Sequence, residues 1–160
     1  MMATAPPIRT QMLGRLQHRN VALRSVSAAC KLVAKGEKVT KTPVWNEFHC
    51  QVISAVSEAF NNIVLHGYEG RDDGVIEMEI HTRPDHISVE LRDYGSSFDP
   101  RMAKDPELDS LPESGLGIFI IKSFMNVRYR AGYPNVLTLS KKLTPSKPRA
   151  AKPRVRVGES

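Results

Sequence analysis

Two short segments of this sequence alternate between apolar and polar residues, and they constrain the fold more than any other feature. Every second residue is apolar in residues 76–80, and residues 87–91 repeat the pattern. Successive side chains of a β-strand point to opposite faces, so each segment predicts a strand with one buried face. A short turn at Pro84 and Asp85 separates them, which predicts an antiparallel hairpin. Other parts of the chain must therefore cover one face of a sheet.

Helical periodicity predicts that cover. Apolar residues recur every three or four positions in residues 20–34 and 44–66, and a mostly apolar segment at 116–125 predicts a third helix. Residues 127–131 and 136–140 predict a second pair of strands. We therefore expect an α+β fold: a two-layer α/β sandwich with helices on one face of a mixed, mainly antiparallel sheet.

The length and the charge distribution predict one domain with a basic tail. A chain of 160 residues, 41% of them hydrophobic, suits a single core. The net charge of +6 lies entirely in residues 141–160, where seven Lys or Arg face one acid. We expect disorder in residues 1–10, a folded domain in residues 11–142 and a disordered basic tail in residues 143–160. A nucleic-acid-binding fold would carry its basic excess on a folded face, so we expect no direct nucleic-acid partner, although the tail could contact an acidic one.

No segment suggests a membrane or an exported protein. The longest apolar runs fall short of the roughly 18 residues that a membrane-spanning helix needs, and the N-terminus lacks the apolar run of a signal peptide. We expect no membrane partner and a cytoplasmic location. Cys30 and Cys50 lie in apolar helical patterns and not in a metal-binding pair, so we expect two buried thiols.

The first candidate functional motif is EAFNNIVLHGY on the long helix. Glu58 and Asn62 are four residues apart and share a helix face. A carboxylate can accept a proton, and an amide oxygen one turn later can bind Mg²⁺, which prefers oxygen ligands. Alternatively, the two residues belong to an ordinary solvent-exposed face.

The second motif is LRDYGSSFDP at the end of the second strand. Asp93 stands where a side chain can enter a pocket, and its carboxylate can accept a hydrogen bond from the exocyclic amine of adenine. Gly95, which lacks a Cβ, would let the backbone pass close to a bound ring. The alternative is a plain turn, because Asp and Gly end strands for local reasons.

The third motif is ESGLGIFIIKSF, after a long loop over residues 94–114 that we expect to act as a lid. Gly115 and Gly117 flank the start of a helix for which Ser114 is the expected N-cap. Free backbone N–H groups and the helix dipole make such a start an anion site. The alternative is a flexible hinge with close helix packing. Together, the three motifs would supply a base and metal ligand, an adenine contact and a phosphate cradle, which favours an ATP site.

These motifs resemble the conserved boxes of the GHKL ATPase and kinase superfamily. EAFNNIVLHGY resembles its N box, RDYGSSFDP its first glycine box and SGLGIFIIKSFM its second. The amino-acid sequences of all three motifs, and the short lid between Asp93 and Gly115, are most similar to those of the RsbW-like anti-sigma-factor serine kinases. The resemblance covers about residues 12–140.

The resemblance implies a Bergerat-type ATP site. Glu58 would be the catalytic base that activates a serine hydroxyl, and Asn62 would bind Mg²⁺. Asp93 would bind adenine with Gly95 beside it, and Gly115 and Gly117 would shape the phosphate cradle. The resemblance also implies a homodimer whose partners are a sigma factor and a STAS-domain anti-anti-sigma protein that it phosphorylates.

Two departures from the family pattern leave other functions open. Ser96–Ser97 stand where many relatives have glycine or proline, and Glu113 stands where a basic residue is frequent. One alternative is a nucleotide-dependent switch that binds a partner without phosphoryl transfer. Another is a stand-alone ATPase domain similar to those of histidine kinases, although the chain has no room for their helical hairpin.

Overall fold

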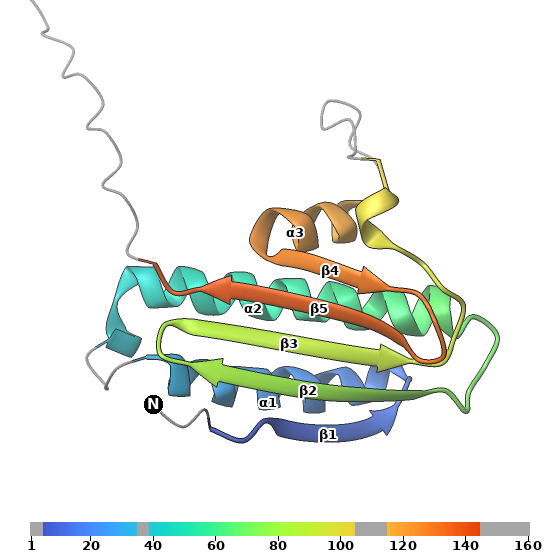
Figure 1. The fold of residues 1–160 in the computed structure, drawn as a ribbon, viewed down its shortest axis with the longest axis horizontal. Helices are drawn as coiled ribbons and strands as arrows, with labels where there is room; N and C mark the ends of the chain where they lie inside the picture. The colour runs from blue at the N-terminus through green and yellow to red at the C-terminus, as the bar shows by residue number, and fades with distance from the viewer. Residues whose placement is uncertain (1–4, 35–38, 105–114, 145–160) are drawn as a thin grey trace, which may run out of the picture.

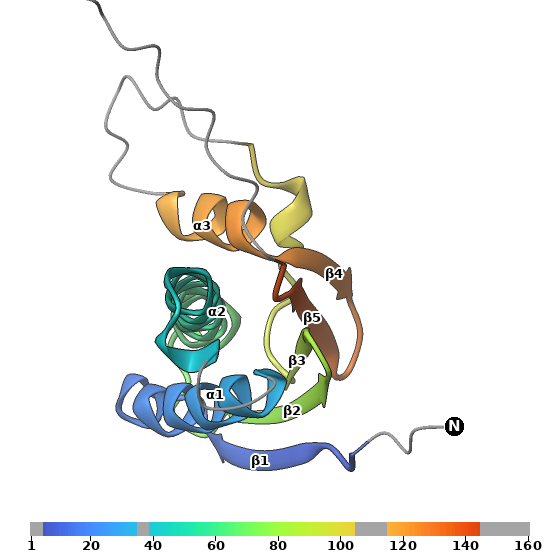
Figure 2. The same ribbon diagram turned by 90° about the vertical axis from the view of Figure 1, so that its left-hand side faces the viewer.

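The computed structural model describes residues 5–34, 39–104 and 115–144, which form two layers with the helices on one side of a single sheet (Figure 2). The strands are β1 (Ile8–Leu13), β2 (Val75–Arg83), β3 (His86–Asp93), β4 (Asn126–Arg130) and β5 (Asn135–Lys142). The helices are α1 (Arg19–Val33), α2 (Pro43–Asn62) and α3 (Leu116–Phe124). Short helical turns occur at η1 (Leu16–His18), η2 (Val39–Lys41), η3 (Ile63–Gly67) and η4 (Pro100–Met102). The expected α+β sandwich is therefore confirmed.

The strand order in the sheet is β1-β2-β3-β5-β4 (Figure 1). All four pairings among these described strands are antiparallel, so the sheet is not the mixed one that we expected. Both predicted hairpins are present, and β5 pairs with β3 rather than lying at an edge. This pairing brings the start of β5 beside the end of β3, with Asn135 directly opposite Asp93.

Strand β1 corrects our expectation for the N-terminus. We expected disorder through residue 10, but β1 begins at Ile8, which pairs with Ile80 of β2. Its sequence IRTQML is too polar for the apolar alternation to stand out, yet Met12 is buried on the helix side. The edge of β2 offers unpaired backbone groups, and β1 pairs with them from Ile8 to Leu13. Of the expected C-terminal tail, residues 145–160 lie outside the described part of the chain.

Helix α2 lies in the middle of the helix layer, between α1 and α3 (Figure 2). Thr42 caps its N-terminus by accepting a hydrogen bond from the Trp45 amide at 3.2 Å, and Pro43 occupies the first turn, where no N–H is needed. Its apolar face, which includes Phe48, Val52, Val56 and Phe60, is buried in the core. Each of these side chains contributes about 1.5–3 kcal/mol through burial.

The two thiols differ in exposure. Cys30 is fully buried on α1, whereas Cys50 is exposed on α2, so our expectation was wrong for Cys50. Cys50 follows the buried Phe48 by two residues, which is about 200° around the helix and therefore the outward side. Within the described residues, no helix is long and apolar enough to cross a membrane.

Candidate functional site

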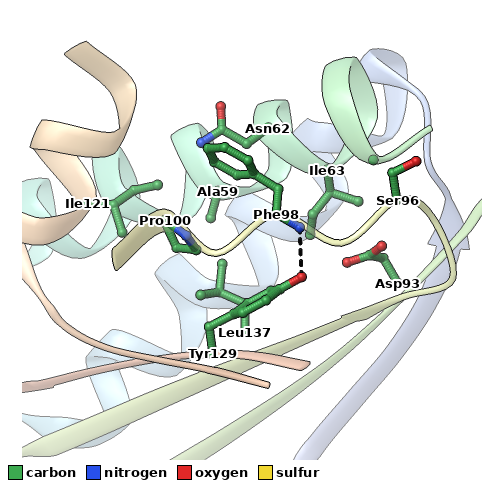
Figure 3. A pocket seen from close by; sticks show the side chains of 11 residues that line it. Ala59, Asn62, Ile63, Asp93, Ser96, Phe98, Pro100, Ile121, Tyr129 and Leu137 are labelled. Atoms are coloured by element: carbon green, nitrogen blue, oxygen red, sulfur yellow. Dashed lines mark hydrogen bonds between the residues drawn. The ribbon is translucent and has the colours of Figure 1, made fainter. Parts of the chain in front are cut away.

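Asp93 ends strand β3 with its side chain turned toward the helix layer, and only 5% of the residue is exposed. Its Oδ1 accepts hydrogen bonds from the Gly95 amide and from Nδ2 of Asn135, each at 3.0 Å. No described residue hydrogen-bonds to Oδ2, and the carboxylate points into a pocket between the sheet and α2 (Figure 3). This geometry leaves one acceptor for a ligand.

Asn135 holds this carboxylate in place, and our sequence analysis missed it. The residue is 1% exposed, and its Nδ2 donates to the Gly95 carbonyl as well as to Asp93. Its Oδ1 accepts from the Ser97 hydroxyl at 2.7 Å and from the Gly132 amide at 3.1 Å. A buried asparagine is costly unless its groups are paired, as they are here. In the sequence it resembles an ordinary turn residue beside Pro134, and only the β3–β5 pairing gives it this position.

The surroundings of Asp93 affect its ionisation. Burial raises the pKa of the Asp93 carboxyl, because the charged form loses its hydration. The hydrogen bonds from Asn135 and Gly95 stabilise the charged form and partly offset that increase. Asp93 is therefore a carboxylate with one oxygen oriented by the protein and one facing the pocket.

We expected Gly95 to let the backbone pass close to a bound ring, but the structure shows that it contacts the backbone of Gly67. A Cβ on Gly95 would lie 2.2 Å from the carbonyl oxygen of Gly67, so the residue makes a close backbone contact at which no side chain fits. Gly67 closes the π-helical turn η3, in which the Tyr68 amide donates to the Ile63 carbonyl at 2.9 Å. The Ser96 amide also donates to the Gly67 carbonyl at 2.8 Å. These contacts join the end of α2 to the loop after β3.

Eleven residues line the pocket, among them the predicted Asn62 and Asp93. Asn62 comes from α2, and the ring of Phe98 lies just below its amide (Figure 3). The Phe98 amide donates to the Tyr129 hydroxyl at 2.8 Å, which fixes the loop over the pocket. The cavity volume is about 30 Å³, room for roughly two water molecules. A cavity of this size is too small for a nucleobase unless its lining moves.

Glu58 lies outside the wall of this pocket, beside the start of α3. A Cβ on Gly117 would lie 2.5 Å from Oε2 of Glu58, so the missing side chain makes room for that carboxylate. Gly115 is the N-cap of α3 with φ of 92°, a left-handed conformation that favours glycine. This differs from our expectation of Ser114, which lies outside the described residues. The start of α3 is the end of the helix at which negative charge is stabilised.

The residues available for a metal are few. Within the described residues, no group of three or more His, Cys, Asp or Glu side chains could hold a metal ion. Asn62 is part of the pocket lining and offers one amide oxygen. Such a donor set fits Mg²⁺ only if the nucleotide phosphates and water supply the other ligands.

Comparison with known proteins identifies relatives. A family model described as a histidine kinase-like ATPase domain matches residues 16–141. An anti-sigma F factor of Clostridium beijerinckii is 35% identical over 79 residues, covering 47% of this chain and 55% of that protein. A serine-protein kinase RsbW of Listeria innocua is 34% identical over 95 residues, with coverages of 52% and 60%. The RsbW of Staphylococcus aureus is 38% identical over 81 residues, with coverages of 45% and 51%. The chain thus spans about half the length of the curated relatives it matches.

Proposed function

Because this chain belongs to the histidine kinase-like ATPase domain family, we propose that it is an ATP-dependent protein serine kinase that also acts as an anti-sigma factor. Its partners in this proposal are a sigma factor, which it sequesters, and a STAS-domain anti-anti-sigma protein, which it phosphorylates. The names of the relatives, anti-sigma F factor and serine-protein kinase RsbW, support this choice of partners. We also propose a homodimer and a cytoplasmic location.

One observation carries the nucleotide part of the proposal: the buried Asp93 presents an oxygen to the pocket with no protein partner among the described residues. Adenine carries an exocyclic amine that donates to such an acceptor, and the apolar wall of Ile63, Ile121 and Leu137 suits the flat faces of a ring. With adenine at Asp93, the phosphates would extend toward the start of α3. Gly115 and Gly117 would there leave the backbone N–H groups open to them.

Phosphoryl transfer would use Glu58 as the base. Its carboxylate lies at the first turn of α3, where the γ-phosphate is expected. Glu58 would take the proton of the substrate serine as the serine oxygen bonds to the γ-phosphorus, and the bond to the bridging oxygen of ADP would break. Asn62 would hold Mg²⁺ with the phosphates, and the metal would supply charge neutralisation. Such transfer depends mainly on positioning and on electrostatic stabilisation.

Transfer of label from γ-labelled ATP with Mg²⁺ to candidate STAS-domain proteins tests this proposal. We expect labelled serine with the native chain and no detectable transfer with Glu58→Gln, whose ATP affinity should remain within a few-fold. Glu47→Gln, on an earlier turn of α2, is the matched control and should transfer normally. ATP binding without transfer to any candidate would favour the nucleotide-dependent binding switch. Transfer by Glu58→Gln at the native rate would exclude Glu58 as the base.

A further inference from the structure

None of the described helices covers the second face of the sheet (Figure 2). A pocket on this face lies where β3 stops and β5 begins, and this end of the two strands is on the right in Figure 1. We call it the aromatic–acidic pocket, and its lining includes Tyr94, Tyr133 and Glu77 together with Tyr68, Arg71 and Asp73. Its cavity volume is about 320 Å³, enough for one large side chain. None of these residues belongs to the candidate ATP site.

The two tyrosines are arranged to present aromatic surface. The centroids of Tyr94 and Tyr133 are 4.9 Å apart with the rings at 72°, an edge-to-face pair. Tyr133 is 83% exposed in the β4–β5 turn, far more than an aromatic side chain that only stabilises the fold. The Tyr94 hydroxyl donates to Oε1 of Glu77 at 3.1 Å, which fixes the first ring beside the carboxylate.

Within the described part of the chain, no cation balances the charge of Glu77 in this pocket. No cationic group of the described residues forms an ion pair with Glu77. Arg92 lies directly opposite Glu77 in the β2–β3 register, but its guanidinium pairs with Glu90 and Glu79 instead. A carboxylate next to two aromatic rings attracts a cation and repels an anion.

The lining of the pocket already contains one cation next to an aromatic ring. The Arg71 guanidinium lies 5.5 Å from the centroid of Tyr68, and Asp73 pairs with it at 3.3 Å. Asp73 neutralises this arginine, so the lining keeps the net negative charge of Glu77. Tyr133 and Tyr94 have no such cation among the described residues.

From these contacts we propose that the aromatic–acidic pocket binds an arginine or lysine side chain of a partner protein. The cation would rest against the ring of Tyr133 and pair with the carboxylate of Glu77, while its methylene groups contact Tyr94. Asp93 and Tyr94 are consecutive residues of an extended segment, so their side chains point to opposite faces of the sheet. The partner would therefore bind on the side of the sheet away from the nucleotide pocket.

Titration of the ¹⁵N-labelled full chain, without nucleotide, tests the proposal. The probes are three glycine-flanked peptides that differ in one central residue: arginine, norleucine or glutamate. We expect the arginine peptide to shift the amide signals of Tyr94, Gly74 and Gly132, and the other two to leave them unchanged. Because no ATP is present, this result is independent of the proposed kinase activity.

Substitutions identify the groups involved. Glu77→Gln and Tyr133→Ala should each weaken arginine-peptide binding two- to fivefold or more, as expected for a salt bridge or a cation–π contact near the surface. Glu47→Gln, at an exposed position of α2 outside the pocket lining, is the control and should bind normally. The spectrum outside the pocket reports whether each variant is folded. Equal shifts with norleucine, or unchanged affinity in a folded Glu77→Gln, would overturn the proposal.

Discussion

Replacing Asp93 with asparagine removes one hydrogen-bond acceptor from the pocket and leaves its shape unchanged. The retained Oδ1 can still accept from the Gly95 amide and the Asn135 side chain, which lie 3.0 Å away in the native protein. The oxygen that faces the pocket becomes an NH₂ group, which donates and cannot accept a hydrogen bond from the exocyclic amine of adenine. The substitution therefore separates nucleotide recognition from folding.

The expected loss of affinity follows from the type of hydrogen bond removed. A hydrogen bond to a charged group contributes about 1.5–3 kcal/mol net, which corresponds to a roughly 10- to 150-fold weaker Kd. Titration calorimetry should show this loss for ATP and little loss for purine riboside triphosphate, which lacks the exocyclic amine. Equal losses for the two nucleotides would refute the assignment of Asp93 to that amine.

The same variant should not lose stability at neutral pH. Burial raises the pKa of Asp93 in the folded protein above its ordinary value of 3.8, so folding favours the protonated form. Ionised Asp93 therefore lowers the free energy of unfolding. The destabilisation by ionised Asp93 is fully present above its raised pKa, and it disappears as the pH falls below 3.8. Urea unfolding should show Asp93→Asn to be at least as stable as the native chain at pH 7, with the difference decreasing in acid. A marked loss of stability at pH 7 would show that the charge itself holds the loop.

Three other substitutions or labels test separate parts of the structure. Gly95→Ala places a Cβ 2.2 Å from the Gly67 carbonyl oxygen and should destabilise the protein by about 1–3 kcal/mol in urea unfolding; native stability would contradict the close contact. Phe98→Ala should speed association of a fluorescent ATP analogue several-fold in stopped-flow measurements, because Phe98 lines the narrow pocket beside Asn62 (Figure 3), and an unchanged rate would show that another step limits entry. A thiol reagent should label the exposed Cys50 quickly and Cys30 only on unfolding, because burial raises the pKa of Cys30 to about 12. Mass spectrometry of digests measures the order of labelling, and faster labelling of Cys30 would contradict the prediction.

The helices and the two hairpins were predictable from the sequence because their periodicity is local. Each repeat of three to four residues, or of two, reports which side of one element is buried, and it needs no knowledge of the neighbours. The same is true of the spacing that puts Glu58 and Asn62 on one face of α2. The position of Asp93 at a strand end was equally visible, since the alternation of β3 stops there.

Strand β1 was not predictable in this way, because its polar sequence carries almost no alternation. It is a strand because β2 offers it a free edge, and that edge exists only in the assembled sheet.

The sequence by itself determined which residues could form an ATP site, through three motifs in a fixed order on a helix, a strand end and a helix start. Only the tertiary structure decided where they lie relative to one another. Asn135 lies 42 residues from Asp93 and reaches it because β5 pairs with β3. Gly95 must be a glycine because the π-helical turn brings Gly67 against it, and Gly117 lacks a side chain where Glu58 packs. Such contacts join distant segments, and a local pattern cannot encode a neighbour that only the folded sheet supplies.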